Sequence, residues 1–186
     1  MARLSELRKA GITAATVARL EREGAVVRLG RGLYQLSDAP LDTHHTLAEA
    51  AKLVPKGVVC LLSALAFHDL TDSIPPRVWM AIGRKDWRPR ITRPPIRFVR
   101  FGPKVLDAGI EEHIIEGVTV RIYGPAKTVV DLFRYRRTLG LNPALEALRE
   151  ALRQRKSTPA EIAQYAVEGR VWTLTRPYLE GLTADA

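Results

Sequence analysis

The stretch that decides the fold covers residues 11–36 and reads GITAATVARLEREG, followed at once by AVVRLGRGLYQL. Its first half predicts a helix, because Thr13 suits the N-cap, where its hydroxyl can accept a hydrogen bond from a free backbone N–H group. Val17 and Leu20 are three residues apart and share the face of this helix that points to a core. Gly24 can take the left-handed conformation that commonly ends a helix.

The second half of this stretch predicts a short basic hairpin. Residues 26–29 and 33–36 read as two strands, and the tip at residues 30–32 is an arginine between two glycines, which allow a tight turn. Residues 4–10 read as a short helix before the turn at Gly11. Two helices followed by a basic hairpin are typical of a winged helix-turn-helix, which places one helix in the DNA major groove.

Five residues of this module suit contact with DNA. Thr13, Thr16 and Arg19 lie on the predicted helix away from its apolar face and would read bases. Arg28 and Arg31 lie on the hairpin and would hold phosphates. A winged helix normally has three helices before its wing, so either the first helix is missing here or a helix expected at residues 46–54 replaces it.

Length and composition set the class of protein. The chain has 186 residues, is 46% hydrophobic and carries a formal net charge of +9, which suits one core plus a small appended domain. No apolar run approaches the roughly 18 residues that a membrane-spanning helix needs. The single cysteine, Cys60, excludes a disulfide within the chain and agrees with a cytoplasmic location.

The placement of charge is more informative than its total. Residues 1–40 carry a net charge of +3, whereas residues 77–104 carry nine Lys or Arg against one acidic residue. So many like charges repel one another unless an anionic partner meets them, and DNA, RNA or an acidic protein face would all serve. We expect a basic partner surface made by Arg84, Lys85, Arg88, Arg90, Arg93, Arg97 and Arg100. Among the nearby aromatics we expect Trp79, Phe98 and Phe101 in the core and Trp87 exposed.

The rest of the chain predicts an α+β fold in two domains. A polar turn at residues 37–40 separates a winged helix-turn-helix module at 1–39 from a domain at 40–186, which combines a small sheet with C-terminal helices. Ser63 is expected to cap a short helix that ends near Leu70. The Arg- and Pro-rich segment 83–95 reads as a loop or an extended hairpin arm. The expected strands are 78–82, 96–101, 111–115 and 118–122, and the later helices begin at 125, 141, 158 and 171.

The sequence offers no convincing enzyme site. Ser63, His68 and Asp69 supply a hydroxyl, an imidazole and a carboxylate, but their spacing in one short helix points them to different faces. His44 and His45 are adjacent and do not converge on one ion, and we expect no metal or cofactor.

Three motifs resemble the AbiEi family of antitoxins from type IV toxin–antitoxin systems. The first runs from Ala10 to the Arg-Gly-x-Tyr wing at residues 31–34, the second is LSALAFHDL at 62–70, and the third is YGPAKTVVDL at 123–132. In the third, the residues that match the family helix are Pro125, Lys127, Thr128 and Asp131. Asp131 lies among apolar neighbours, so it must be paired or hydrogen-bonded if it is inside the core. Lys127 lies one helical turn before it, and we expect a structural salt bridge or a cap here.

The resemblance implies a function. It implies an autoregulator that represses its own operon by binding repeated promoter sites, and an antitoxin that neutralises a nucleotidyltransferase-like AbiEii toxin, with direct contact between the two left open. It also implies a role in phage resistance. The alternatives are a protein-interaction module without a DNA role, an orphan regulator without a toxin, and an enzyme that acts on RNA through residues 77–104.

Overall fold

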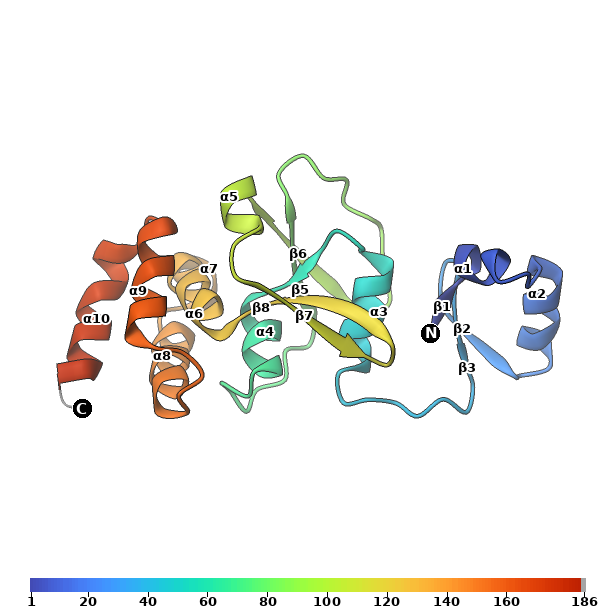
Figure 1. The fold of residues 1–186 in the computed structure, drawn as a ribbon, viewed down its shortest axis with the longest axis horizontal. Coiled ribbons are helices and arrows are strands. Elements are labelled where there is room, and N and C mark those ends of the chain that lie inside the picture. The colour runs from blue at the N-terminus through green and yellow to red at the C-terminus, as the bar shows by residue number, and fades with distance from the viewer. Residues whose placement is uncertain (185–186) are drawn as a thin grey trace.

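A computed structural model describes residues 1–184 and shows three parts in a row. An N-terminal unit of two short helices and a small sheet lies at one end, a five-stranded sheet lies in the centre, and a group of helices forms the other end (Figure 1). The fold is therefore mixed α and β, as the sequence predicts.

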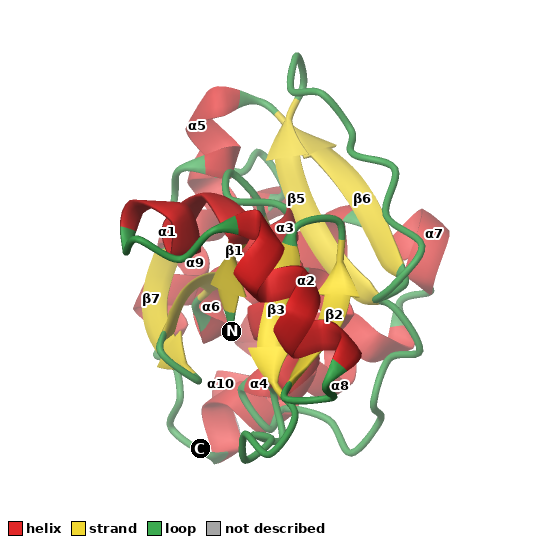
Figure 2. Cartoon of the chain, turned by 90° about the vertical axis from the view of Figure 1, so that its right-hand side faces the viewer, coloured by secondary structure: helices red, strands yellow, loops and turns green. Residues whose placement is uncertain are grey.

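The N-terminal unit is built on a three-stranded antiparallel sheet. It contains strand β1 (Ala2–Arg3), helices α1 (Leu4–Lys9) and α2 (Ala14–Arg22), and strands β2 (Val26–Gly30) and β3 (Leu33–Leu36). The strand order is β1-β3-β2, so the hairpin is completed by a two-residue strand that the sequence did not predict. Seen from this end, α1 and α2 lie in front of the small sheet (Figure 2).

The central sheet is mixed and has the strand order β6-β5-β4-β8-β7. The β5–β6 and β4–β8 pairs are parallel, and the β4–β5 and β7–β8 pairs are antiparallel. Its strands are β4 (Val58–Val59), β5 (Val78–Gly83), β6 (Ile96–Phe101), β7 (Ile110–Ile115) and β8 (Val118–Tyr123).

Alternate residues of each strand supply two cores, one on each face of the sheet. On β5, Val78, Met80 and Ile82 pack with α3 (His45–Leu53), while Trp79 and Ala81 belong to the core on the opposite face. That second core also holds two helices that lie between strands of the sheet in the chain, together with the helices that follow its last strand. These are α4 (Leu61–Phe67), α5 (Pro103–Leu106), α6 (Pro125–Arg134), α7 (Arg136–Leu139), α8 (Asn142–Arg153), α9 (Pro159–Glu168) and α10 (Trp172–Ala184).

One local expectation is wrong, and another is met by one of its two alternatives. Ser63 does not cap α4, because the helix begins at Leu61 after an extended Cys60, and the Ser63 hydroxyl instead accepts from the backbone N–H of Trp79 at 2.9 Å. The segment after Gly83 is a loop, and the alternative of a hairpin arm fails because β5 and β6 run parallel. A parallel pair needs a crossover of about a dozen residues, and here the connection rises above β5 and runs back beside β6 (Figure 2).

Within residues 1–184, no helix combines the length and apolar character that crossing a membrane requires.

Candidate nucleic-acid interface

The start of α2 carries two hydroxyls in contact. Thr13 is the N-cap and its Oγ1 accepts from the backbone N–H of Thr16 at 3.1 Å, as predicted from the sequence. The two Oγ1 atoms lie 2.9 Å apart, so one hydroxyl donates to the other. Both are near the helix N-terminus, and the Thr16 hydroxyl can turn from its neighbour to a new acceptor or donor without moving the backbone.

Arg19 lies one turn further along α2 and is not free. Its Nη1 is 2.7 and 2.8 Å from the two carboxylate oxygens of Glu23, on an exposed part of the helix. An exposed pair four residues apart contributes only about 0.3–0.5 kcal/mol. Arg19 can therefore exchange Glu23 for a stronger acceptor at little cost, and Glu23 holds the guanidinium above the helix surface until it does.

The hairpin presents two arginines on a fixed support. Arg28 is exposed on β2, where its Nε donates to the carbonyl of Gly30 at 3.3 Å, and Arg31 is exposed at the tip. The tip is anchored: the backbone N–H of Leu4 donates to the carbonyl of Gly32 at 2.8 Å. A side chain at Gly30 would lie 3.3 Å from Leu53 of α3, so the hairpin packs closely against the central part.

Charged contacts join the N-terminal unit to α3. Arg3 Nε donates to the carbonyl of Lys52 at 2.9 Å, and Lys52 Nζ lies 2.7 Å from a carboxylate oxygen of Glu6. The backbone N–H of Arg3 and the Lys52 ammonium together hold the pKa of Glu6 below its ordinary value. The helix expected at residues 46–54 is α3, and these contacts place it against the N-terminal unit. A winged helix normally has three helices, and α3 is therefore available as the third.

The chain between the two parts is fixed to the β7–β8 turn by Glu116. Its carboxylate accepts from the backbone N–H of Asp42 at 2.8 Å and lies 2.9 Å from Nδ1 of His45. Burial alone would raise the pKa of Glu116, but these two contacts hold it below the ordinary value. The connection therefore has a defined path at its second end.

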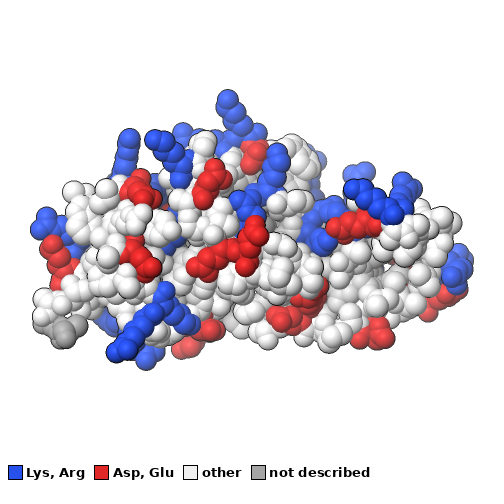
Figure 3. Space-filling view, viewed as in Figure 1, with Lys and Arg blue, Asp and Glu red and all other residues white. Residues whose placement is uncertain are grey.

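The basic segment 77–104 forms an exposed surface. All seven residues predicted for the partner surface are exposed: Arg84, Lys85, Arg88, Arg90, Arg93, Arg97 and Arg100. Lys and Arg side chains line the upper edge of the molecule over the central and N-terminal parts, while acidic side chains lie mostly lower on that face (Figure 3). Trp79 and Phe101 are buried, Phe98 is partly buried and Trp87 is exposed, which confirms the expectation for the aromatics.

Two of these arginines also make contacts within the protein. Arg100 Nη1 donates to the carbonyls of Gly83, Arg84 and Asp86 at 2.7–3.0 Å, which fixes the base of the loop. The guanidinium of Arg97 lies 4.4 Å from the centre of the Trp79 ring.

Helix α6, which carries the third sequence motif, is buried rather than displayed. Lys127 Nζ contacts Asp131 Oδ2, and Arg134 Nε lies 3.6 Å from Asp131 Oδ1. Burial raises the pKa of the Asp131 carboxyl and lowers the pKa of the Lys127 ammonium. The ammonium also lies 4.5 Å from the centre of the Tyr123 ring. The expected internal ion pair is present, and Pro125 opens the helix at its first turn.

The second and third motifs meet at one carbonyl. The Tyr123 carbonyl accepts from Nε2 of His68 at 2.8 Å and from the Thr128 hydroxyl at 3.1 Å. Burial holds the pKa of His68 below its ordinary value, so the ring stays neutral as a donor. These motifs therefore fasten α4 and α6 to the end of β8.

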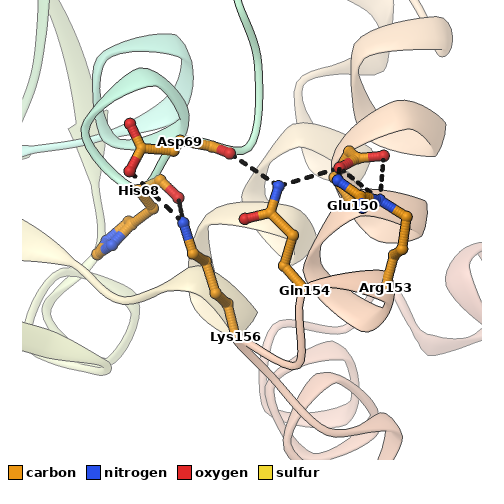
Figure 4. A network of polar contacts seen from close by, with 6 residues as sticks. All are labelled: His68, Asp69, Glu150, Arg153, Gln154 and Lys156. Carbon is orange, nitrogen blue, oxygen red and sulfur yellow. Dashed lines mark hydrogen bonds and ion pairs between the residues drawn. The ribbon is translucent and has the colours of Figure 1, made fainter.

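A polar network then fastens the end of α4 to the segment after α8. Lys156 donates to the His68 carbonyl and lies 3.6 Å from an Asp69 carboxylate oxygen, while Gln154 donates to the Asp69 carbonyl at 3.0 Å (Figure 4). Asp69 thus serves a structural contact with Lys156 and Gln154, while the Ser63 hydroxyl is bonded to the backbone of Arg77 and Trp79. Within the described residues, no group of three His, Cys, Asp or Glu side chains could hold a metal ion.

The arrangement defines a mixed α and β protein with a two-helix N-terminal unit and an exposed basic surface. Residues 1–37, about a fifth of the chain, match the model of a family described as a transcriptional regulator, AbiEi antitoxin. This confirms the predicted resemblance over those residues. No curated protein matches the chain.

A solved structure resembles the whole chain. The crystal structure of the RV2827C protein from Mycobacterium tuberculosis matches with a TM-score of 0.61 at 13% sequence identity, and the match covers 97% of this chain and 73% of that one. A likeness at this identity concerns the fold alone.

Proposed function

We propose that this protein is a DNA-binding transcriptional regulator whose residues 1–39 act as a winged helix-turn-helix. In this proposal α2 is the recognition helix and the β2–β3 hairpin is the wing. One observation carries it: the residues that match the AbiEi regulator family, 1–37, are the same residues that form α1, α2 and the three-stranded sheet.

The chemistry of α2 supports base reading. Thr13 and Thr16 offer hydroxyls at the helix end that enters a groove, and Arg19 can make two hydrogen bonds to a guanine once it leaves Glu23. Arg28 and Arg31 would hold phosphates beside the groove. Because these contacts release condensed counterions, the logarithm of the affinity should fall linearly with the logarithm of salt concentration, by about 0.9 for each neutralised phosphate.

We further propose that residues 40–186 form the antitoxin domain of a type IV system and that the protein acts in the cytoplasm. The description of the matched family as an antitoxin supports a toxin partner in general, and we propose that this toxin resembles a nucleotidyltransferase, as the sequence resemblance implies. The buried Lys127–Asp131 pair makes α6 the frame of this domain, so an exposed surface, and not this motif, would act on the toxin or its target.

The regulatory proposal is tested by a salt titration of promoter binding with two matched variants. Arg31→Ala should weaken binding to operator and unrelated DNA equally and reduce the salt slope by about one. Arg149→Ala removes an exposed arginine of α8 far from the hairpin and should change neither quantity. The proposal that the hairpin is a DNA-binding wing is rejected if promoter binding does not depend on salt concentration, or if Arg31→Ala and Arg149→Ala bind DNA with equal affinity.

The antitoxin proposal is tested by co-expression with the reading frame immediately downstream of the gene. We expect a nucleotidyltransferase-like toxin there, growth arrest when it is expressed alone, and recovery when this protein is added. Arg31→Ala should still restore growth, because neutralisation and DNA binding use different parts of the chain. If the downstream reading frame encodes another kind of protein and its expression does not arrest growth, the antitoxin proposal is wrong and the protein is a regulator without a toxin.

A further inference from the structure

The loop between β5 and β6, residues 84–95, carries positive charge without internal compensation. Among the described residues, no carboxylate lies within 4.0 Å of a Lys or Arg of segment 77–104. The acidic residue of that segment, Asp86, accepts instead from the backbone N–H of Gly83 at 2.8 Å. Elsewhere, seven Lys or Arg side chains have a carboxylate within 4.0 Å. The uncompensated charge of this segment therefore favours an anion from outside.

The same loop displays an indole. Trp87 is 78% exposed, although tryptophan is mostly buried in folded proteins. In the chain it stands between Asp86 and Arg88, with Arg84 and Lys85 just before them. Among the described residues of segment 77–104 it is the one large hydrophobic side chain that is highly exposed.

The loop is held in shape while it presents this ring. Arg100 binds three carbonyls at its base, and Asp86 closes the turn after Gly83. The guanidinium of Arg88 lies 5.5 Å from the centre of the Phe98 ring, and Pro94 is buried. A fixed support reduces the entropy that a partner must overcome on binding.

We propose that this loop is a second nucleic-acid site, which binds a single strand by stacking an unpaired base on Trp87 while the neighbouring cations contact the phosphates. Base stacking on an aromatic ring beside cations is how proteins hold single strands. A duplex keeps its bases stacked inside and offers no face to the indole. The buried centre of a protein interface is depleted of charged residues, whereas Trp87 is flanked in the loop by Lys85, Asp86 and Arg88, which favours a nucleic-acid strand over a protein partner.

This site is separate from the proposed recognition helix. The loop belongs to the central sheet, whereas Arg19 and Arg31 belong to the N-terminal unit. Binding of a single strand therefore does not depend on promoter recognition, and either property can fail without the other.

The test is fluorescence anisotropy with the full chain and labelled strands of about 12 nucleotides, within the range that one such site occupies. An RNA strand, a DNA strand of the same sequence and the corresponding DNA duplex are compared. We expect Trp87→Ala to weaken single-strand binding about tenfold, Trp87→Phe to restore most of it, and the double variant Arg88→Gln with Arg90→Gln to reduce its salt dependence. The control is Ile74→Ala, which removes another exposed apolar side chain and should have no effect.

The outcomes separate the alternatives. Preference for RNA or for DNA among the two strands identifies the source, and either preference supports the site. The inference is wrong if no single strand binds. It is also wrong if the duplex binds as tightly as the single strands and Trp87→Ala leaves both affinities unchanged, since the loop would then contact only the phosphate backbone. It is also wrong if Arg19→Ala or Arg31→Ala abolishes strand binding, because the strand would then occupy the N-terminal unit, as the proposed function would allow.

Discussion

Removal of the Asp131 carboxylate should destabilise the whole chain. Asp131 is fully buried and Lys127 is 4% exposed, so Asp131→Ala leaves an ammonium inside the core with no carboxylate partner. Breaking a buried pair in this way costs about 3–5 kcal/mol. Proteins of this kind are stable by roughly 5–15 kcal/mol, so the loss is a large part of the total.

The cost of leaving Lys127 unpaired can be separated from the net contribution of the Lys127–Asp131 pair to stability. Replacing both partners by apolar residues of similar volume, Lys127→Met with Asp131→Leu, removes the buried charges together. Such replacements are often neutral or stabilising by about 1–4 kcal/mol. Because Arg134 still lies nearby and loses its 3.6 Å contact with Asp131, we expect the double variant to fall between the single variant and the natural chain.

Urea denaturation followed by circular dichroism measures both variants. The midpoint should fall steeply for Asp131→Ala with an unchanged slope, and a thermal scan should show a decrease of roughly 6–20 °C for a chain of this size. The reasoning is refuted if Asp131→Ala loses less than about 1 kcal/mol, or if the double variant loses as much as the single one. A stable double variant that no longer relieves toxicity would show that the motif has a functional role as well.

Three further effects follow from the contacts. Thr13→Ala removes the N-cap hydroxyl of α2 and should cost about 0.5–2 kcal/mol of stability, measured by denaturation; an unchanged midpoint would contradict the cap. Glu6 and Glu116 have a folded pKa below the ordinary value of 4.5, so their stabilisation is complete above that value and is lost as pH falls through the lower folded pKa. The melting temperature of Glu116→Gln should therefore depend less on pH below about 4.5 than that of the natural chain, and parallel curves would exclude this role. Thr128→Val leaves the Tyr123 carbonyl with one donor and should cost about 1 kcal/mol by denaturation, whereas a cost near zero would remove this bond from the account.

Locally encoded features could be predicted from the sequence. The Thr13 cap and the capping box of Thr158 with Glu161 are present because each needs only residues three apart in the chain. The pairing of Lys127 with Asp131 could be predicted for the same reason, since one turn of helix brings them together. The Arg19–Glu23 pair has this spacing as well, so the sequence contains the signal for it.

Features that depend on distant contacts could not be predicted. Strand β1 has two residues and forms because Ala2 pairs with Tyr34. No local sequence pattern predicts this pairing. The parallel pairing of β5 with β6 depends on strand order, which is set by packing and not by the intervening loop. Ser63 is a residue type that commonly caps helices, but its hydroxyl accepts a hydrogen bond from the backbone N–H of Trp79, sixteen residues away.

A comparison of two arginines decides whether α2 reads DNA. Arg19 pairs with Glu23 on α2, and Arg176 pairs with Glu180 on α10, with the same spacing and similar exposure. Each is changed to alanine, and affinities for the chain's own promoter and for a scrambled fragment are measured at one salt concentration. The account predicts that Arg19→Ala lowers the ratio of promoter to scrambled affinity about tenfold, as the loss of one base contact should, while Arg176→Ala leaves it unchanged. An unchanged ratio for Arg19→Ala, or an equal fall for both variants, would contradict it.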